Sequence, residues 1–189
     1  KALAKLESQI KGLQAKAKPS GKRPEAGYHS KIEKSPDRAK WVQVDLGERV
    51  DIKKIILHAC HDDHNAIGAG FGFPVRFQII ASNRADFSRS QVLVDESDLD
   101  FANPGLVPIE HGVQSSARYI RVKATKLAPR SNDFIFALAE LEVLDGNDKN
   151  RALKAKVSSI DSIEAPNRWR RSNLTDGIWA QVSDKASTR

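Results

Sequence analysis

Trp41-Val-Gln-Val-Asp-Leu-Gly47 is the stretch that says most about the architecture of this 189-residue chain. Its apolar and polar side chains alternate with a period of two, which is typical of a β-strand with one buried face. Gly47 then predicts a turn. Outward from this stretch, strand patterns recur at residues 52–58, 75–81, 91–94, 118–124 and 134–144. Many short strands separated by turns, with no alternation of strands and helices, predict an all-β antiparallel β-sandwich or barrel.

The first 18 residues carry a different pattern. Apolar residues repeat with alternating spacings of three and four, at Leu3, Leu6, Ile10, Leu13 and Ala17. This a/d repeat predicts a short α-helix over residues 1–18. A helix of this length is marginal alone in water, so it must pack on another helix or on the sandwich. Residues 19–40 read as a basic linker and opening loop.

The net charge of +7 is unevenly distributed. Residues 1–40 carry a net +7, residues 41–150 a net −4, and residues 151–189 a net +4. A nucleic-acid-binding face interleaves basic and aromatic residues, and only Arg168-Trp169-Arg170-Arg171 offers that pattern. We therefore predict no nucleic-acid partner.

Composition excludes two further classes. The single cysteine, Cys60, cannot form an internal disulfide and is expected to be a small buried thiol. No apolar run reaches the length of a membrane span.

Because the sequence contains no methionine, we expect it to be a fragment of a longer chain. A missing signal peptide therefore says nothing about export.

Five strand motifs, taken in order, resemble the discoidin domains, also called coagulation-factor type C domains or family 32-like carbohydrate-binding modules. The motifs are Trp41–Gly47, Ile52–Leu57, Phe73–Asn83, Ala117–Val122 and Ala139–Val143. The resemblance implies a galactose-binding-like jelly-roll sandwich whose loops at one end bind a ligand without catalysis. It also implies an exported protein, extracellular, periplasmic or at the cell surface, of the kind found in large planctomycete-type bacterial proteins.

The segment 147–189 departs from the order of the family. Val157–Ala165, Trp169 and Asn173-Leu-Thr-Asp-Gly177 look like the family's opening strand and D-G loop, which usually precede the tryptophan strand. Either the segment closes the same sandwich in permuted order, or it begins a second module. We favour closure, because termini of such sandwiches are often close in space and a 40-residue half-module could not bury a core alone.

The densest set of polar ligand types is His58-Ala-Cys-His61-Asp-Asp-His64. Imidazole and carboxylate groups at this spacing could bind a transition metal, or they could lie in a solvated loop. A third interpretation is a sugar site, which needs convergent polar groups and one apolar ring. His61, Asp62 and His64 would supply hydrogen bonds, and Phe71 would supply the ring.

Arg130 and Asn132 precede the last core strand and complete the predicted ligand-binding set. The planar donors of arginine suit vicinal hydroxyls or the acidic groups of a glycan. A turn whose side chains satisfy their own backbone is the alternative. Whether this loop lies at the same end of the sandwich as residues 61–71 depends on the tertiary structure.

The resemblance also implies a structural Ca²⁺ ion, with Asp176 and Glu140 at the matching ligand positions. Hard oxygen ligands are what Ca²⁺ requires, although Glu140 could instead pair with a basic residue. Both ligands belong to one site only if the permuted closure is right.

No arrangement of nucleophile and base, and no pair of convergent carboxylates, is recognisable. The sequence therefore predicts a non-catalytic carbohydrate-binding module that recognises a glycan, possibly an acidic one. A structural or protein-interaction module is the alternative, with the helix at residues 1–18 contacting a parent protein or an oligomer. A metal-dependent enzyme is a third class.

Overall fold

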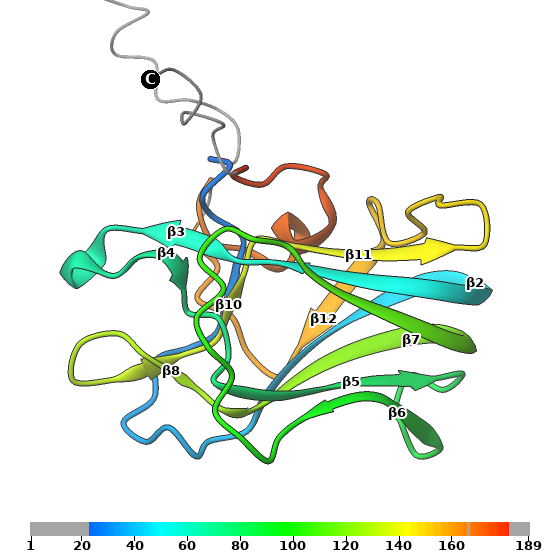
Figure 1. Ribbon diagram of the computed structural model, residues 1–189, viewed down its shortest axis with the longest axis horizontal. Coiled ribbons are helices and arrows are strands. Elements are labelled where there is room, and N and C mark those ends of the chain that lie inside the picture. Colours follow the sequence, from blue (N-terminus) through cyan, green and yellow to red (C-terminus); the bar gives the residue numbers. More distant parts are fainter. Residues whose placement is uncertain (1–22, 166, 182–189) are drawn as a thin grey trace, which may run out of the picture.

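The computed structural model describes residues 23–165 and 167–181. Its main feature is a six-stranded antiparallel sheet in the order β11-β2-β7-β5-β6, with β12 also pairing with β2 (Figure 1). The strands of this sheet are β2 (Lys40–His58), β5 (Arg76–Ser82), β6 (Ser90–Glu96), β7 (Ile109–Lys126), β11 (Glu140–Asp145) and β12 (Lys156–Ser159). The predicted all-β antiparallel sandwich is confirmed.

Three two-stranded ladders complete the strand structure. They pair β1 (Tyr28–His29) with β10 (Ala137–Leu138), β3 (Cys60–Asp62) with β4 (Gly68–Phe71), and β8 (Ala128–Pro129) with β9 (Phe134–Ile135). Helical structure in the described part of the chain consists of two short 3₁₀ helices, η1 (His64–Ala66) and η2 (Arg171–Thr175). The predicted helix over residues 1–18 lies outside the described residues.

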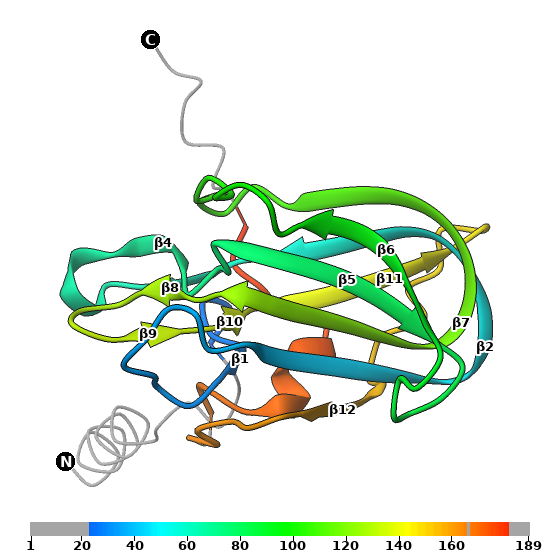
Figure 2. The same cartoon turned by 90° about the horizontal axis from the view of Figure 1, so that it is seen from below.

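The two longest strands each contribute to both layers of the sandwich. Figure 2 shows β2 and β7 running side by side and bending together at one end of the molecule. The bend falls where the register between them is irregular, between Asp45 and Val50, and Gly47 has a φ of +83° there. The turn predicted after Gly47 is therefore a bend inside one continuous strand, because β7 follows it with hydrogen bonds on both sides.

The inward face of β2 changes parity along its length. The even-numbered residues Val42, Val44, Leu46, Val50 and Ile52 belong to the core, whereas beyond Ile52 the odd-numbered Ile55 and Leu57 belong to it. A second register irregularity between Ile52 and Lys54 makes this change possible. Because successive strand residues face opposite sides, one inserted residue is enough to exchange the buried and exposed faces.

The segment 134–144, predicted as one long strand, is divided into β9, β10 and β11. β9 pairs with β8, β10 with β1, and β11 with β2, so each piece meets a different partner. The apolar side chains from Ile135 to Val143 are buried, including Phe136, Leu138 and Leu141, whereas Phe134 and Leu144 at the ends are partly exposed. Burial of both faces of its central part explains why the sequence of this segment is mostly apolar and does not alternate.

The C-terminal segment packs within the same sandwich. β12 pairs antiparallel with residues 42–45 of β2, and both Ala152 and Leu174 lie in the main core cluster. Trp169 bridges to Gly27, where a Cβ would lie only 2.1 Å from the Leu138 carbonyl oxygen. The N-terminal and C-terminal segments therefore meet along one seam beside β10.

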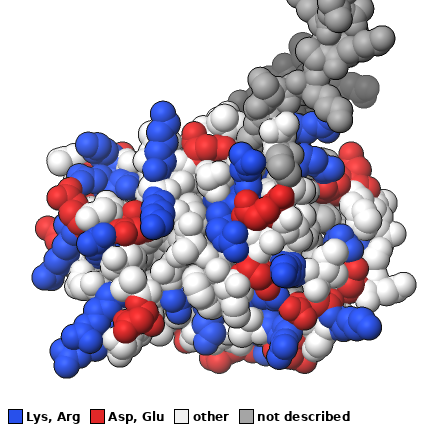
Figure 3. Space-filling model, turned by 180° about the vertical axis from the view of Figure 1, so that it is seen from behind, with Lys and Arg blue, Asp and Glu red and all other residues white. Residues whose placement is uncertain are grey.

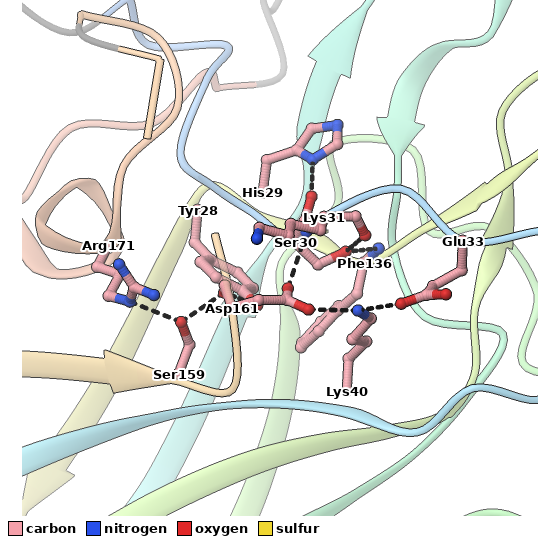
Figure 4. A network of polar contacts seen from close by, with 10 residues as sticks. All are labelled: Tyr28, His29, Ser30, Lys31, Glu33, Lys40, Phe136, Ser159, Asp161 and Arg171. Atoms are coloured by element: carbon pink, nitrogen blue, oxygen red, sulfur yellow. Dashed lines mark hydrogen bonds and ion pairs between the residues drawn. The ribbon is translucent and has the colours of Figure 1, made fainter. Parts of the chain in front are cut away.

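A buried ion network stabilises this seam (Figure 4). Lys40 is only 4% exposed, and its Nζ donates to the carboxylates of Glu33 and Asp161. The Asp161 carboxylate also accepts the Lys31 backbone N–H at 2.8 Å, and its main-chain oxygen accepts the Tyr28 hydroxyl at 3.1 Å. Figure 4 shows these groups converging between the opening segment and the end of β12.

Candidate functional site

The β3–β4 hairpin carries four of the predicted ligand-binding residues, His61, Asp62, His64 and Phe71. His61 is partly exposed on β3, and its Nε2 lies 3.0 Å from Asp63 Oδ1. Asp62 Oδ1 accepts the His64 backbone N–H at 3.0 Å, which shapes the tip of the hairpin. Asn65 and Ala66 follow with positive φ angles of 52° and 57°. His64 is exposed at this tip, whereas His61 and Asp62 lie nearer the body.

A second hairpin, β8–β9, brings Arg130 and Asn132 to the same end of the molecule. The Asn65 amide nitrogen donates to the Arg130 carbonyl oxygen at 3.2 Å, so the tips of the two hairpins touch. Figure 1 shows the hairpins side by side at the end opposite the bend of β2 and β7. The tertiary structure thus brings together residues that the sequence could not place relative to one another.

The guanidinium of Arg130 is already engaged. Its Nε and Nη2 donate to the two carboxylate oxygens of Asp133 at 2.8 and 2.7 Å. These hydrogen bonds raise the pKa of Arg130 and lower the pKa of Asp133. The bidentate pair leaves Arg130 with fewer donors for a ligand, while Asn132 between the two residues is exposed.

A pocket of about 700 Å³ opens beside the β3–β4 hairpin. We call it the hairpin pocket, and its lining is Arg23, Pro24, Glu25, Ala26, His61, Asp62, Asp63, Leu106, Arg168, Ala180 and Gln181. It collects side chains from the opening segment, the hairpin, the loop before β7 and the C-terminal segment. His61 and Asp62 are the predicted site residues that line it.

Phe71 does not offer a ring to a ligand, and this prediction was wrong. The side chain is 2% exposed and packs in a second core cluster with Trp169 and Cys60. The rings of Phe71 and Trp169 stack with centroids 5.8 Å apart, and the His29 ring meets Trp169 at 5.0 Å. The glycines before Phe71 suggested an exposed loop, but β4 pairs with β3 and turns the ring inward.

Two residues outside the predicted set reach the site. Arg168 Nη2 contacts the Asp62 carboxylate, and its guanidinium lies over the Trp169 ring, 5.5 Å from the centroid. Trp179 is half-buried and stacks on His58, with centroids 4.3 Å apart. The basic and aromatic run at 168–171 was a visible signal for Arg168, whereas nothing in the sequence marked Trp179 as a partner of His58.

The histidine cluster does not converge on a metal ion. His58 lies on the outer face of β2, is 5% exposed, and its Nε2 contacts Glu142 Oε1 at 2.7 Å. His61 and His64 belong to the hairpin beyond it. Within residues 23–165 and 167–181, no three His, Cys, Asp or Glu side chains are arranged to hold a metal ion. Cys60 is buried, as expected for a structural thiol.

Glu140 and Asp176, the residues expected to bind Ca²⁺, lie beside the same main-chain loop. Glu140 is fully buried on β11, and its Oε1 accepts the Gly177 N–H at 3.0 Å. Asp176 Oδ1 accepts the Ile178 N–H at 3.0 Å. The two carboxylates therefore both accept hydrogen bonds from the backbone of residues 177–178.

Charged residues of both signs alternate over the surface. Figure 3 shows lysine, arginine, aspartate and glutamate interspersed over one face, with no continuous basic stripe on that face. Among the described residues, no helix is long and apolar enough to cross a membrane.

No family model matches the chain, and no curated protein matches it significantly. Similar solved structures include the family 32 carbohydrate-binding module of Clostridium perfringens NanJ in complex with galactose. That module is 16% identical, with a TM-score of 0.48 and coverage of 64% of this chain and 77% of that chain. A second module from the same organism, in complex with GalNAc-beta-1,3-galactose, is 15% identical with a TM-score of 0.48 and coverage of 64% and 76%.

A third similar structure is the first family 32 module of a Clostridium perfringens family 31 glycoside hydrolase. It is 16% identical, with a TM-score of 0.45 and coverage of 67% of this chain and 89% of that chain. All three structures come from the family that the five strand motifs resemble.

Proposed function

We propose that this chain is a non-catalytic carbohydrate-binding module that takes a glycan in the hairpin pocket. The observation that carries the proposal is the pocket itself, about 700 Å³ in volume, where His61 and Asp62 of β3 meet Arg168 of the C-terminal segment. Sites of a few hundred cubic ångströms with a small number of convergent polar groups are typical of small-ligand recognition.

The recognition chemistry follows from these side chains. The Asp62 carboxylate accepts hydrogen bonds from sugar hydroxyls, Arg168 donates to hydroxyl oxygens, and His61 does either. The contact between Asp62 and Arg168 orients both groups before a ligand arrives. His64 and Asn132, exposed on the neighbouring hairpin tips, would contact further sugar units, and Arg130 would hold the β8–β9 turn in place.

The charge of the lining favours a neutral glycan over a strongly acidic one. The hairpin pocket contains two arginines, Arg23 and Arg168, against three carboxylates, Glu25, Asp62 and Asp63. A polyanionic ligand would face this local excess of negative charge. Such a module works by raising the local concentration of its parent protein at the glycan, which suits an exported protein.

Calorimetry with a panel of soluble glycans tests the proposal, beginning with galactose and GalNAc-β-1,3-galactose. Arg168→Ala and His61→Ala should each weaken binding by about tenfold, the loss expected when a hydrogen bond to a charged group is removed. Arg49→Ala is the matched control, because Arg49 lines a different pocket near the bend of β2. Loss of binding in the control, or none in the two pocket variants, would reject this site.

We also propose that Glu140 and the loop at residues 176–178 hold a structural Ca²⁺ ion. Buried carboxylate oxygens are suitable donors, and Asp176 lies next to the backbone N–H that Glu140 accepts. Since no third acidic side chain joins them among the described residues, most ligands would be main-chain carbonyl oxygens. The ion would fasten the C-terminal loop to β11.

A further inference from the structure

A second groove adjoins the hairpin pocket and differs from it in chemistry. It has a volume of about 330 Å³ and is lined by Ile56, His58, Leu106, Pro108, Glu110, Glu142, Trp179, Ala180 and Gln181. We call it the tryptophan groove. Its lining shares Leu106, Ala180 and Gln181 with the hairpin pocket, so the two are neighbours on either side of the C-terminal segment.

The outer face of the sheet forms the floor of this groove. Glu142 on β11 and Glu110 on β7 are both cross-strand partners of Ile56 on β2, so the two carboxylates flank one apolar side chain. Trp179 forms a wall, and its ring stacks on His58 with centroids 4.3 Å apart. The groove therefore combines an aromatic ring, an apolar floor and two acidic groups.

Among the residues that the structure describes, the lining contains acceptors of hydrogen bonds and no lysine or arginine. His58 Nε2 lies 2.7 Å from Glu142 Oε1, and because an ionised carboxylate only accepts, the nitrogen donates this hydrogen bond. The His58 side chain is only 5% exposed, and its Nδ1 has no hydrogen-bond partner among the described residues. The carboxylates of Glu110 and Glu142 give the groove a negative character.

The charge of each glutamate is only partly compensated by its neighbours. Glu110 pairs with Lys54 at 2.8 Å, but both side chains are well exposed, and exposed pairs attract weakly. Glu142 contacts His58 and, at 3.4 Å, the Asn150 amide. A ligand cation would thus find an aromatic face together with carboxylate charge, the combination that stabilises an ammonium group.

We propose that the tryptophan groove is a subsite for a cationic amino sugar, a hexosamine unit that carries a free amine. The sugar ring would lie on the apolar face of Trp179, and its ammonium group would face Glu110 and Glu142. This proposal rests on the proposed glycan-binding function and extends it, because a glycan crossing Ala180–Gln181 would occupy both cavities.

Paired probes test the subsite: the trimer of glucosamine and the trimer of N-acetylglucosamine, which lacks the charge. Calorimetry should show that Glu110→Gln weakens binding of the glucosamine trimer several-fold and leaves the acetylated trimer within about twofold. Trp179→Ala should weaken both trimers by about tenfold, and Trp179→Phe should restore part of the affinity. Added salt should weaken only the glucosamine trimer.

Arg168→Ala separates this inference from the proposed function. If Arg168→Ala weakens glycan binding but Glu110→Gln and Trp179→Ala do not, the hairpin pocket stands and the tryptophan groove is rejected. If Arg168→Ala has no effect on any glycan, the proposed function fails. Equal affinity for the two trimers would show that the groove does not recognise the free amine. If trilysine binds equally tightly and its binding also depends on Trp179, the groove recognises a cation and not a sugar.

Discussion

Lys40 and Asp161, which are 121 positions apart, form a buried ion pair that joins the start of β2 to the segment after β12. Lys40 also contacts Glu33, so one ammonium holds two carboxylates from segments far apart in the sequence. Burial alone would lower the pKa of Lys40, but the hydrogen bonds to Asp161 and Glu33 outweigh it and raise the pKa.

Asp161→Asn should lower the free energy of unfolding by about 1–3 kcal/mol, since Lys40 keeps Glu33 but loses half of its compensation. Urea denaturation measures the change. Asp98→Asn is the matched control, because Asp98 is exposed and should vary by less than about 0.5 kcal/mol. Equal stability of the two variants would show that the ion pair contributes nothing.

Stability should fall at alkaline pH. Burial, followed by the charge of Asp161, raises the pKa of Tyr28, and the pKa of Lys40 is also raised. Groups with raised pKa values hold their protons more tightly in the folded state, so their contribution is intact below about pH 10 and is lost as the pH rises further. Thermal unfolding from neutral pH to pH 11 should follow this decline.

Tyr28→Phe should make that alkaline decline shallower while costing about 1 kcal/mol at neutral pH, because the hydrogen bond to the Asp161 oxygen is removed. Tyr119→Phe serves as the matched control and should leave the decline unchanged. An unaltered pH profile in Tyr28→Phe would contradict the assignment of the decline to Tyr28.

A separate loss of stability should occur at mildly acidic pH. Burial is the main cause that lowers the pKa of His29, against the opposing effect of its hydrogen bond to the Ser30 carbonyl oxygen. A lowered pKa means that stability is present above about pH 6.5 and is lost as the pH falls below it. Burial also lowers the pKa of His111, which adds to the same window.

His29→Gln should flatten the profile of melting temperature between about pH 7 and pH 5, apart from the part due to His111. His64→Gln, at the exposed hairpin tip, should leave the profile as it is. A steep profile that survives in His29→Gln would assign the acid sensitivity to other groups.

Phe71 should matter for stability and not for direct contact with sugar. Phe71→Leu keeps most of the apolar volume and should cost up to about 1.5 kcal/mol, while Phe71→Ala should cost about 3–5 kcal/mol. Glycan affinity of the folded Phe71→Leu variant should equal that of the native chain. A large loss of glycan affinity in Phe71→Leu with little loss of stability would show instead that the Phe71 ring stacks on the sugar.

Calcium should stabilise the native chain. Removing divalent ions with a chelator should lower the melting temperature by a few degrees, and added Ca²⁺ should restore it, because an ion that binds only the folded state stabilises it. Glu140→Gln should abolish the response and leave the glycan-binding pocket in place. A melting temperature that is the same with chelator and with Ca²⁺ would reject the proposed calcium site.

The sequence predicted the strands better than it predicted their connections. The alternation in residues 41–46 is a local property, so the first part of β2 could be read directly from the chain. The bend that makes β2 one strand depends on β7, which follows it across both layers. The division of 134–144 into three strands depends likewise on partners that an apolar run does not name.

The candidate site shows the same limit. His61, Asp62 and Arg168 were each visible as polar residues in informative places, but their meeting in one pocket results from the path of the C-terminal segment. Phe71 was predicted to face the ligand because the glycines around it do not indicate whether its ring faces solvent or packs on Trp169. The stack of Trp179 on His58 carried no sequence signal at all.

By itself the sequence determined the all-β class, the positions of the main strands and the acidic character of the central region. Alternation and charge are local properties that can be read from neighbouring residues. Only the tertiary structure decided which side chains are buried at the ligand end, how the C-terminal segment joins β2, and which charges meet in each pocket. Those outcomes depend on contacts between segments far apart in the sequence, such as Lys40 with Asp161, which are 121 positions apart. A local sequence pattern does not specify which distant segments will meet.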